Sequence, residues 1–399
     1  MCYRSIKARA ALALLVVCLS CHDPLFKVVP TPRNHIGMWH LVAKDTLGIA
    51  IDHHSQSTTY MLNDFFKLGD SSFVAVVHQQ LNTLNIYNLT SKKLSKRIVF
   101  DKDGPNGIGS LFVTHFINYD SILVRGKDDH KLYLMDSAGL VKKTLDLRFE
   151  GMDRIRQLYF TPNGKPLLMG NKVFGVLLPS VNADENRTRL TDLPFYTYDL
   201  LGNAGRKLVR AIQFPKFFRQ DGTRWACTYW EPTFCAFKGK IAYGFPALDS
   251  IYVYDLNTQK IEAHGVPSVE GFVPVEPSRT EWHDGMMVKL VKPVYLNYLL
   301  RYDPYQDVFY RFVFLPLEED MNYTDFYRVM ADKPMVVQII DGKDFSVKGE
   351  TTLKSKQFYF RDTFVGEDGL YISNNHPARK NRNEDSISYT HFKISKEHV

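Results

Sequence analysis

One short segment of the chain gathers the ionisable side chains best suited to acid-base chemistry. The run 278–285 contains Arg279, Glu281, His283 and Asp284. A histidine titrates near neutral pH, a carboxylate can exchange protons with it, and a guanidinium can hold a substrate carboxylate. Neighbouring side chains on an extended strand point to opposite faces, so the four cannot all converge. The segment therefore predicts either the polar start of a strand, which we favour, or part of a catalytic site.

Carboxylates define an enzymatic alternative for the whole chain. Glycoside hydrolases use carboxylate pairs that leave no local signature. The segment 221–225, Asp-Gly-Thr-Arg-Trp, is close to a sialidase Asp-box but lacks one residue and the upstream hydroxyl. Neither a Gly-x-Ser-x-Gly elbow nor a His-Glu-x-x-His helix occurs. Whether the protein is an enzyme stays open, with a non-enzyme favoured; a propeller hydrolase or lyase would draw on Glu281, Asp284, Glu231 and Asp221.

Aromatic residues define the binding alternative, which we favour. Three of the four tryptophans lie in two long segments, 214–232 and 265–285. Rigid aromatic rings stack on sugars and anchor protein partners, and nearby cations add polar contacts. The sequence thus predicts a non-enzymatic binding or scaffold module for a glycan, a peptide or an envelope protein. Its contact residues would be Trp225, Trp230, Trp282, Arg279, Arg224 and His283.

No segment predicts a metal site or another cofactor. The run 101–109 begins like a calcium loop, but Pro105 and Phe112 replace two required ligands. It reads better as a glycine-rich turn whose amides could form an anion nest. Asp52, His53 and His54 are adjacent, so their side chains alternate and cannot surround one ion.

A recurring pattern reveals the elements that must position these residues. A hydrophobic strand ends in Asp or Asn, and a turn and a strand with Lys or Arg often follow, most clearly at 132–136 and 251–255. Successive strand-end markers are 48, 63, 56, 48, 38 and 51 residues apart, the period of a four-stranded propeller blade. The markers are Asn88, Asp136, Asp199, Asp255, Asp303, Asp341 and a degenerate copy ending at Phe392.

These markers predict an all-β chain with a single β-propeller. We expect seven blades, with six as the alternative if the crowded interval 303–341 holds an incomplete blade. Three strand pairs read as the middle strands of blades: 73–77 with 84–87, 121–124 with 132–135, and 240–244 with 251–254. The leftover N-terminal strand 41–51 should complete the last blade and close the ring.

Loop lengths predict which face of the ring binds. In a propeller, connections between second and third strands and connections between blades emerge on one face. The four long excursions, 170–193, 214–232, 265–285 and 374–386, all belong to these classes. Long irregular loops are uncommon unless they serve a function, so this face is the predicted binding surface.

The N-terminus reads as a lipoprotein signal peptide over residues 1–20. Arg4, Lys7 and Arg9 precede the apolar run 10–19, which is too short to span a membrane. The ending Leu-Ser-Cys resembles a lipobox and predicts acylation of Cys21, with a plain secretory peptide as the alternative. Residues 21–37 would be a tether and residues 38–399 the propeller, held in the cell envelope on the outer membrane and facing the periplasm or the surface.

The charge after processing excludes one class of partner. Removal of residues 1–20 takes three basic residues with it, so the net charge falls from +7 to +4. No Lys/Arg stripe is present, which argues against nucleic acid. The partners we expect are therefore the membrane, through the N-terminal lipid, and a glycan or envelope protein.

Two cysteines remain after lipidation. Cys227 and Cys235 flank Glu231 and Pro232, so a turn there would place them opposite one another. An exported protein permits a disulfide, and so short a loop would contribute about 2.5 kcal/mol. Two small buried thiols on adjacent strands are the equal alternative.

Three features together resemble one family. The turn 104–109, the lipobox-like leader and the C-terminal run 383–392 are similar to those of the Bacteroidota propeller lipoproteins of unknown function, domain-of-unknown-function family 4221, over nearly the whole mature chain. The resemblance implies an envelope propeller and supplies no catalytic residue. It also implies O-glycosylation where Asp precedes Ser or Thr and a small or aliphatic residue, although Asp-Ser-Ile is equally a turn followed by a strand. The matching positions are Thr46, Ser121, Ser137, Ser250 and Ser386.

Overall fold

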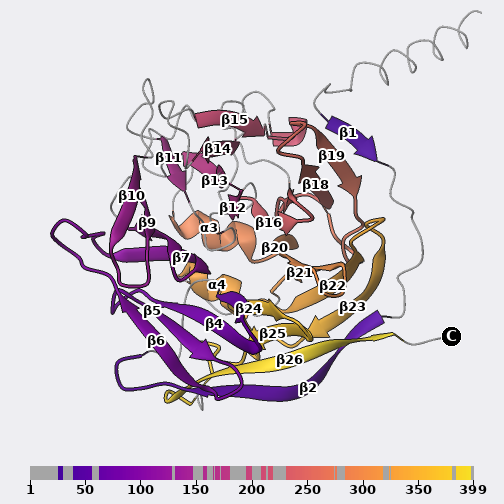
Figure 1. Cartoon of the computed structure of the whole chain (residues 1–399). Coiled ribbons are helices and arrows are strands. Elements are labelled where there is room, and N and C mark those ends of the chain that lie inside the picture. The colour runs from indigo at the N-terminus through magenta and orange to yellow at the C-terminus, as the bar shows by residue number, and fades with distance from the viewer. Residues whose placement is uncertain are drawn as a thin grey trace, which may run out of the picture.

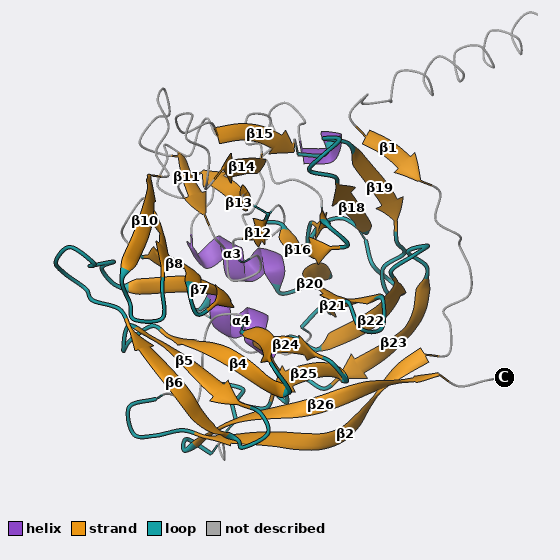
Figure 2. Ribbon diagram, viewed as in Figure 1, coloured by secondary structure: helices purple, strands orange, loops and turns teal. Residues whose placement is uncertain are grey.

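The computed structural model describes residues 26–29, 39–55, 63–127, 131–146, 156–159, 165, 167–170, 172–179, 195–199, 208–212, 214–218, 231–273, 275, 284–317, 323, 325–379 and 383–396. Most of them form antiparallel strands, which are grouped in sheets around a common centre in a β-propeller-like arrangement (Figure 1). Figure 2 shows that the helices α3 (Asp284–Val291) and α4 (Phe326–Asp332) lie near that centre.

The first half of the chain forms three sheets. The first contains β3 (Asp64–Leu68), β4 (Ser71–His78), β5 (Thr83–Asn88) and β6 (Lys93–Val99). The second contains β7 (Leu111–Asn118), β8 (Ser121–Gly126), β9 (Lys131–Met135) and β10 (Val141–Asp146). The third contains β11 (Arg156–Tyr159), β12 (Leu167–Met169), β13 (Lys172–Pro179), β14 (Phe195–Asp199) and β15 (Leu208–Ile212).

The second half continues the same order. The 3-10 turn η2 (Lys216–Phe218) precedes a sheet of β16 (Thr233–Phe237), β17 (Lys240–Gly244), β18 (Ser250–Tyr254) and β19 (Ile261–Gly265). The next group contains β20 (Leu296–Asp303), β21 (Val308–Phe314), β22 (Met335–Asp341) and β23 (Val347–Leu353). The last contains β24 (Tyr359–Gly366), β25 (Gly369–Ser373), β26 (Ser386–Lys396) and the N-terminal β2 (Trp39–Ala50).

The strand β2 joins the two ends of the chain. It pairs antiparallel with β26 along its whole length, from Trp39 opposite Lys396 to Ala50 opposite Ser386. This pairing confirms that the N-terminal strand completes the sheet of C-terminal strands. A single parallel bridge from Trp39 to Gly349 also links β2 to β23, where the carbonyl of Trp39 occupies the space of a Cβ, so only glycine fits.

Asx turns explain the strand-end markers. The carboxylate of Asp255 accepts bonds from the amides of Asn257 (2.9 Å) and Thr258 (3.0 Å). Asp303 does the same for Tyr305 and Gln306, at 2.9 and 3.0 Å. A short side chain that bonds the backbone two and three residues ahead fixes a tight hairpin. The same arrangement recurs at Asn88, Asp136 and Asp341.

Two of these markers belong to one group of strands. Asp303 ends β20 and closes its hairpin with β21, whereas Asp341 ends β22 and closes the hairpin with β23. The markers therefore do not count blades one for one. Among the described residues, the strands fall into six consecutive groups, counting the eight-stranded sheet as two.

Burial on both faces of the sheets explains the weak alternation of the strand sequences. Every residue of β21 is buried, and β22 is buried except at Asp341. A strand that is buried on both faces has no polar face, so its sequence is a continuous apolar run. The largest cluster of buried side chains extends from Leu41 through Tyr243 and Phe312 to Phe392, so it spans sheets from both ends of the chain.

Three sequence expectations need correction or addition. Residues 172–179, placed in a long excursion, form β13 because Val173 and Phe174 pack into the core. Residues 26–29, placed in the tether, form β1 (Phe26–Val29), which pairs in parallel with the outer edge of β19. The interval between β21 and β22 contains the helix α4, which the sequence analysis did not predict. None of the helices in the described ranges is long and apolar enough to cross a membrane.

Candidate functional site at the centre of the ring

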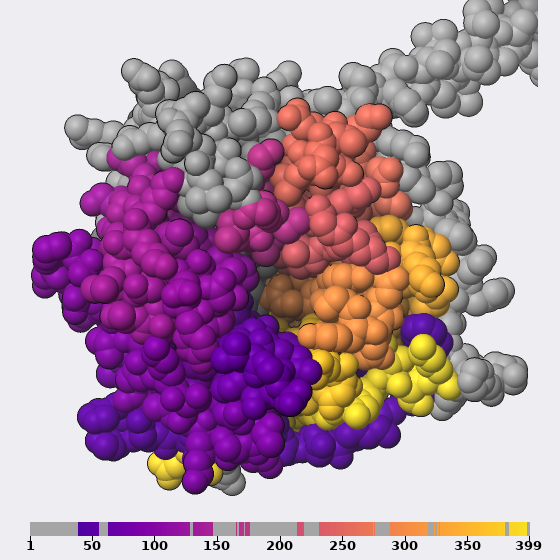
Figure 3. All heavy atoms as spheres, viewed as in Figure 1, coloured from indigo at the N-terminus to yellow at the C-terminus, as the bar shows by residue number. Residues whose placement is uncertain are grey.

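The innermost strands of the sheets converge on the centre of the ring. The strands β12, β16, β20, β24 and β3 lie side by side in that order, and β7 begins the next sheet. Figure 3 shows the visible face hollowed near this centre, between the purple sheets and the orange helical region. Side chains from all six groups meet here, and we call them the axial cluster: Asn63, Asp64, His115, Lys165, Cys235, Arg301 and Asp362.

Asp64 is the most strongly held carboxylate of the axial cluster. It lies 2.9 Å from the ammonium of Lys165 and 3.1 Å from Nδ1 of His115, and the amide of Phe116 donates to it at 2.9 Å. Burial raises the pKa of this carboxyl, but the positive charge of Lys165 and these hydrogen bonds outweigh it. The pKa of Asp64 therefore lies well below its usual range, and the side chain is ionised.

Lys165 is the buried cation that faces Asp64. Its side chain is 9% exposed. Burial lowers its pKa to about 8 although Asp64 opposes the shift, and the nearby charge of Arg301 lowers it further. Lys165 and Arg301 thus lie close enough for their positive charges to interact.

Asp362 lies in a second hydrogen-bonded group on β24. Nδ2 of Asn63 donates to Asp362 and, at 2.7 Å, to the hydroxyl of Tyr389, which itself donates to Asp362 at 2.9 Å. The amide oxygen of Asn63 is buried without a hydrogen-bond partner. Burial is also the main reason that the pKa of Tyr389 lies well above its usual value.

Arg301 differs from the other charged groups because none of the described residues gives it an anionic partner. Its Nη1 donates to the carbonyl of Leu300 at 2.9 Å, whereas Nη2 is buried and makes no hydrogen bond. Burial lowers the pKa of Arg301 to about 10, against the opposing influence of Cys235 and Asp64. An uncompensated guanidinium in such a place is costly, which marks this residue for a role beyond stability.

The two carboxylates of the axial cluster are already engaged. Asp64 and Asp362 already accept from buried donors, so neither is poised to move a proton. The residues that the structure describes include no group of three or more His, Cys, Asp or Glu that could hold a metal ion.

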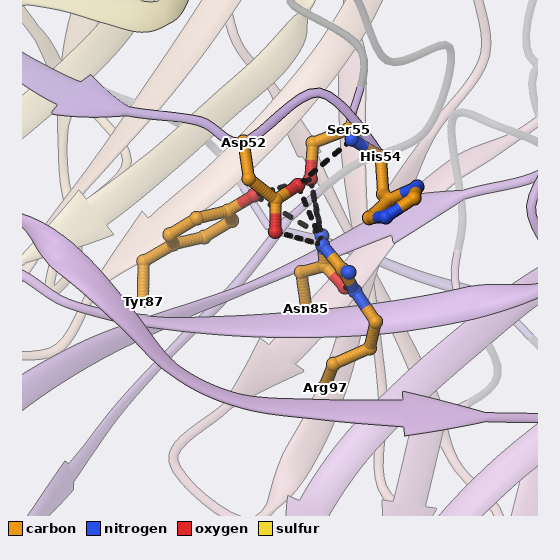
Figure 4. Close-up of polar contacts among 6 residues, drawn as sticks. All are labelled: Asp52, His54, Ser55, Asn85, Tyr87 and Arg97. Atoms are coloured by element: carbon orange, nitrogen blue, oxygen red, sulfur yellow. Dashed lines mark hydrogen bonds and ion pairs between the residues drawn. The ribbon is translucent and has the colours of Figure 1, made fainter.

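A second polar cluster links the last sheet to the first (Figure 4). Arg97 on β6 donates through Nη2 to both carboxylate oxygens of Asp52, at 2.8 and 2.9 Å, and through Nε to Asn85 at 3.0 Å. Ser55 donates to Asp52 at 2.9 Å and accepts from Asn85 and Arg97 at 2.9 and 3.0 Å. Tyr87 completes the network beside Ser55 and Asn85.

This second cluster is a clasp between sheets. The hydrogen bond from Arg97, against a smaller effect of burial, lowers the pKa of Asp52 to about 2. Burial lowers the pKa of the neighbouring His78 to about 4, helped by the charge of Arg97. His53 and His54 are exposed and pack against each other with ring centres 3.8 Å apart. Asp52 is thus engaged with Arg97.

The glycine-rich turn 101–109 uses three of its amides within the turn. The amides of Gly107, Ile108 and Gly109 donate to carbonyls of the same turn at 3.0, 2.9 and 3.0 Å. Gly104 and Gly109 adopt positive φ angles of 90° and 66°, as a tight turn requires. These three amides are therefore not available to an anion, and the nest stays a prediction for the other amides of the turn.

Most of the binding and catalytic residues predicted from sequence lie outside the described residues. Glu231 is half-buried immediately before β16, and Asp284 begins α3. The lipidation site is also outside, and the predicted roles of all of these stay predictions. The residues outside the described ranges are Cys21, Asp221, Arg224, Trp225, Trp230, Arg279, Glu281, Trp282 and His283.

The predicted disulfide also involves an undescribed residue. Cys235 on β16 forms no disulfide with another described residue, and Cys227 lies outside the described ranges. Burial raises the pKa of the Cys235 thiol to about 12. The disulfide stays a prediction.

The predicted O-glycosylation positions divide by exposure. Thr46 is exposed in the middle of β2. Three of the serines begin strands, as expected for a turn followed by a strand: Ser121 begins β8, Ser250 begins β18 and Ser386 begins β26. The hydroxyl of Ser137 accepts a hydrogen bond from Lys96 at 2.9 Å. Modification of these residues stays a prediction.

Comparison with known proteins agrees with the resemblance read from the sequence. Residues 39–174 match the family model DUF4221, a domain of unknown function. These residues belong to the DUF4221 family. No curated protein matches the chain.

Solved structures show the same fold. A DUF4221 member from Bacteroides vulgatus is 20% identical, and the alignment covers 91% of this chain and 100% of that one with a TM-score of 0.75. A candidate exported protein from Bacteroides fragilis is 11% identical, with coverage of 94% and 99% and a TM-score of 0.51. At these identities the likeness concerns the fold alone.

Proposed function

We propose that this DUF4221 protein is a lipid-anchored, non-enzymatic binding module of the cell envelope. It presents one face of a six-bladed ring to a glycan, a peptide or an envelope protein. The six groups of strands support the six-bladed alternative over the seven blades first expected.

The asymmetry between the two faces of the ring carries this proposal. Hairpins between first and second and between third and fourth strands are tight, several of them closed by Asx turns. The long connections run between second and third strands or between sheets, so the strand ends that they join lie on the opposite face. Loops that a rigid scaffold gathers on one side commonly bind. These connections are 180–194, 213–232, 266–295, 315–334 and 374–385.

The place of β1 supports a close approach to the membrane. Cys21 precedes Phe26, the first residue of β1, by five positions. Five extended residues span at most about 18 Å. A lipid on Cys21 would therefore hold the ring by its rim near β19 and leave both faces open. The exported Bacteroides fragilis relative supports a location outside the cytoplasm.

Two measurements test the two parts of the proposal. Replacing Cys21 by Ala should move the protein from the membrane fraction to the soluble fraction, and a variant that still needs detergent would contradict lipid anchoring. For the binding face, a Trp225→Ala, Trp282→Ala double variant should lose partners in a pulldown from native envelopes and on a glycan array.

A matched control separates the two faces. Tyr305 is 49% exposed in the hairpin between β20 and β21, on the opposite face. Tyr305→Ala should retain every partner of the parent protein. A folded double tryptophan variant that also retains all partners and glycans would contradict the proposed face.

A further inference from the structure

Arg301 is the strongest sign of a ligand that the structure reveals. Nη2 is buried without a hydrogen bond, and no carboxylate in the described part of the chain lies within 4.0 Å of the guanidinium. Buried guanidinium groups normally pair with anions, because their fork of donors matches the two oxygens of a carboxylate. Here the donors are present and the acceptor is missing.

The surroundings of Arg301 add a second cation and an unused acceptor. Lys165, nine-tenths buried, has Asp64 as its ion-pair partner, and its three donor hydrogens exceed what one carboxylate oxygen at 2.9 Å accepts. The buried oxygen of Asn63 lacks a donor. Unsatisfied donors and an unsatisfied acceptor in one cluster match a molecule that carries an anionic group together with a hydroxyl or ammonium.

We propose that the axial cluster binds the carboxylate of a small hydroxy or amino acid, held by the guanidinium of Arg301 and the ammonium of Lys165. A hydroxyl or ammonium of the same molecule donates to Asn63. An acidic sugar and an amino acid share this chemistry. The site uses none of the tryptophans of the long-connection face, so it goes beyond the function proposed above.

The charge balance favours a carboxylate over a phosphate. Asp64 and Asp362 lie in the same cluster, and they repel the dianion of a phosphate more than the single negative charge of a carboxylate. Access is consistent with binding, since Arg301 is only partly buried and Figure 3 shows the ring hollowed near its centre.

The test is calorimetric titration of the full-length mature protein in low-chloride buffer. The probes are galacturonate, glutamate, acetate and inorganic phosphate, with glucose as the uncharged comparison. We expect saturable binding of galacturonate or glutamate and weaker binding of acetate and phosphate. Arg301→Met should weaken the bound acid by about tenfold or more, because it removes a charge-assisted pair.

Two further variants keep the test decisive. Arg301→Lys should restore part of the affinity, and Lys343→Gln, which changes an exposed lysine of the hairpin between β22 and β23, should leave it unchanged. If Arg301→Met fails to fold, Lys165→Gln provides the same measurement. The proposal is overturned if no carboxylate binds saturably, if phosphate binds more tightly than every carboxylate, or if a folded Arg301→Met variant binds like the parent. Because membrane fractionation and the tryptophan variant do not touch this site, its failure would leave the proposed envelope function standing.

Discussion

Removing the charge of Arg301 should stabilise the ligand-free protein. Burial depresses the pKa of this group to about 10. A shift of that size from an ordinary arginine corresponds to about 3 kcal/mol of cost for the charged form in the folded state. Arg301→Met keeps the apolar stem and loses the bond to the carbonyl of Leu300, worth about 1 kcal/mol. We therefore expect the free energy of unfolding to rise by about 2 kcal/mol.

Arg311 is the matched control for this prediction. Its pKa is also lowered to about 10 by burial, but its guanidinium donates to Gln338 at 2.7 Å and to carbonyls of Asp249, Val266 and Pro267 at 2.7, 3.2 and 2.6 Å. Arg311→Met leaves these acceptors buried without donors, so it should lower stability by about 3 kcal/mol or more.

Urea unfolding of the parent and both variants at pH 7, followed by tryptophan fluorescence, measures the difference. Opposite signs for the two arginines would support the reasoning. A loss of more than about 1 kcal/mol in Arg301→Met would show that the guanidinium is structural, and the argument for an absent anion would fail.

Two further predictions concern the clasp and the marker turns. The pKa of His78 is lowered from 6.5 to about 4, so between these values the unfolded chain binds a proton that the folded chain excludes. The contribution of His78 to the free energy of unfolding is therefore complete above pH 6.5, and the free energy of unfolding should fall by about 3 kcal/mol as the pH drops to 4. In urea titrations across that range, His78→Gln should make the free energy of unfolding depend less on pH. An unchanged pH dependence would contradict the assignment. Asp303→Ala should cost about 2 kcal/mol, since Asp303 is fully buried and also accepts from Tyr310 at 3.0 Å. The same change at the more exposed Asp255 should cost less than about 1 kcal/mol in the same assay, and equal losses would refute the role of burial.

Local patterns in the sequence predicted the local parts of this fold. The three strand pairs read as the middle of blades are β4 with β5, β8 with β9, and β17 with β18. They could be predicted because the two strands of each pair follow one another closely in the sequence. The strand-end markers gave one blade too many compared with the six groups of strands. The same kind of Asx turn closes the first hairpin of one group at Asp303 and the second hairpin of that group at Asp341.

The axial cluster was not predictable from spacing. Its members come from all six groups of strands, and only Asn63 and Asp64 are neighbours in the sequence. A weaker signal was present: Arg301 lies in β20, and Asp362 lies beside Arg361 in β24, and most residues of both strands are buried. A charged side chain in a strand that packs on both sides is costly unless it has a partner, so such a residue indicates an ion pair or a binding site.

The pairing of β2 with β26 sets the order of events when the protein folds. Residues 39–50 meet residues 386–396, so their partner is made last. Until the chain is complete, one edge of β2 and the whole last sheet offer unpaired amides and carbonyls to other chains. Contacts between the two ends of a chain also form slowly, because the closing loop is long. The protein is therefore most exposed to aggregation in the interval before β26 is made, and closing the ring ends that interval.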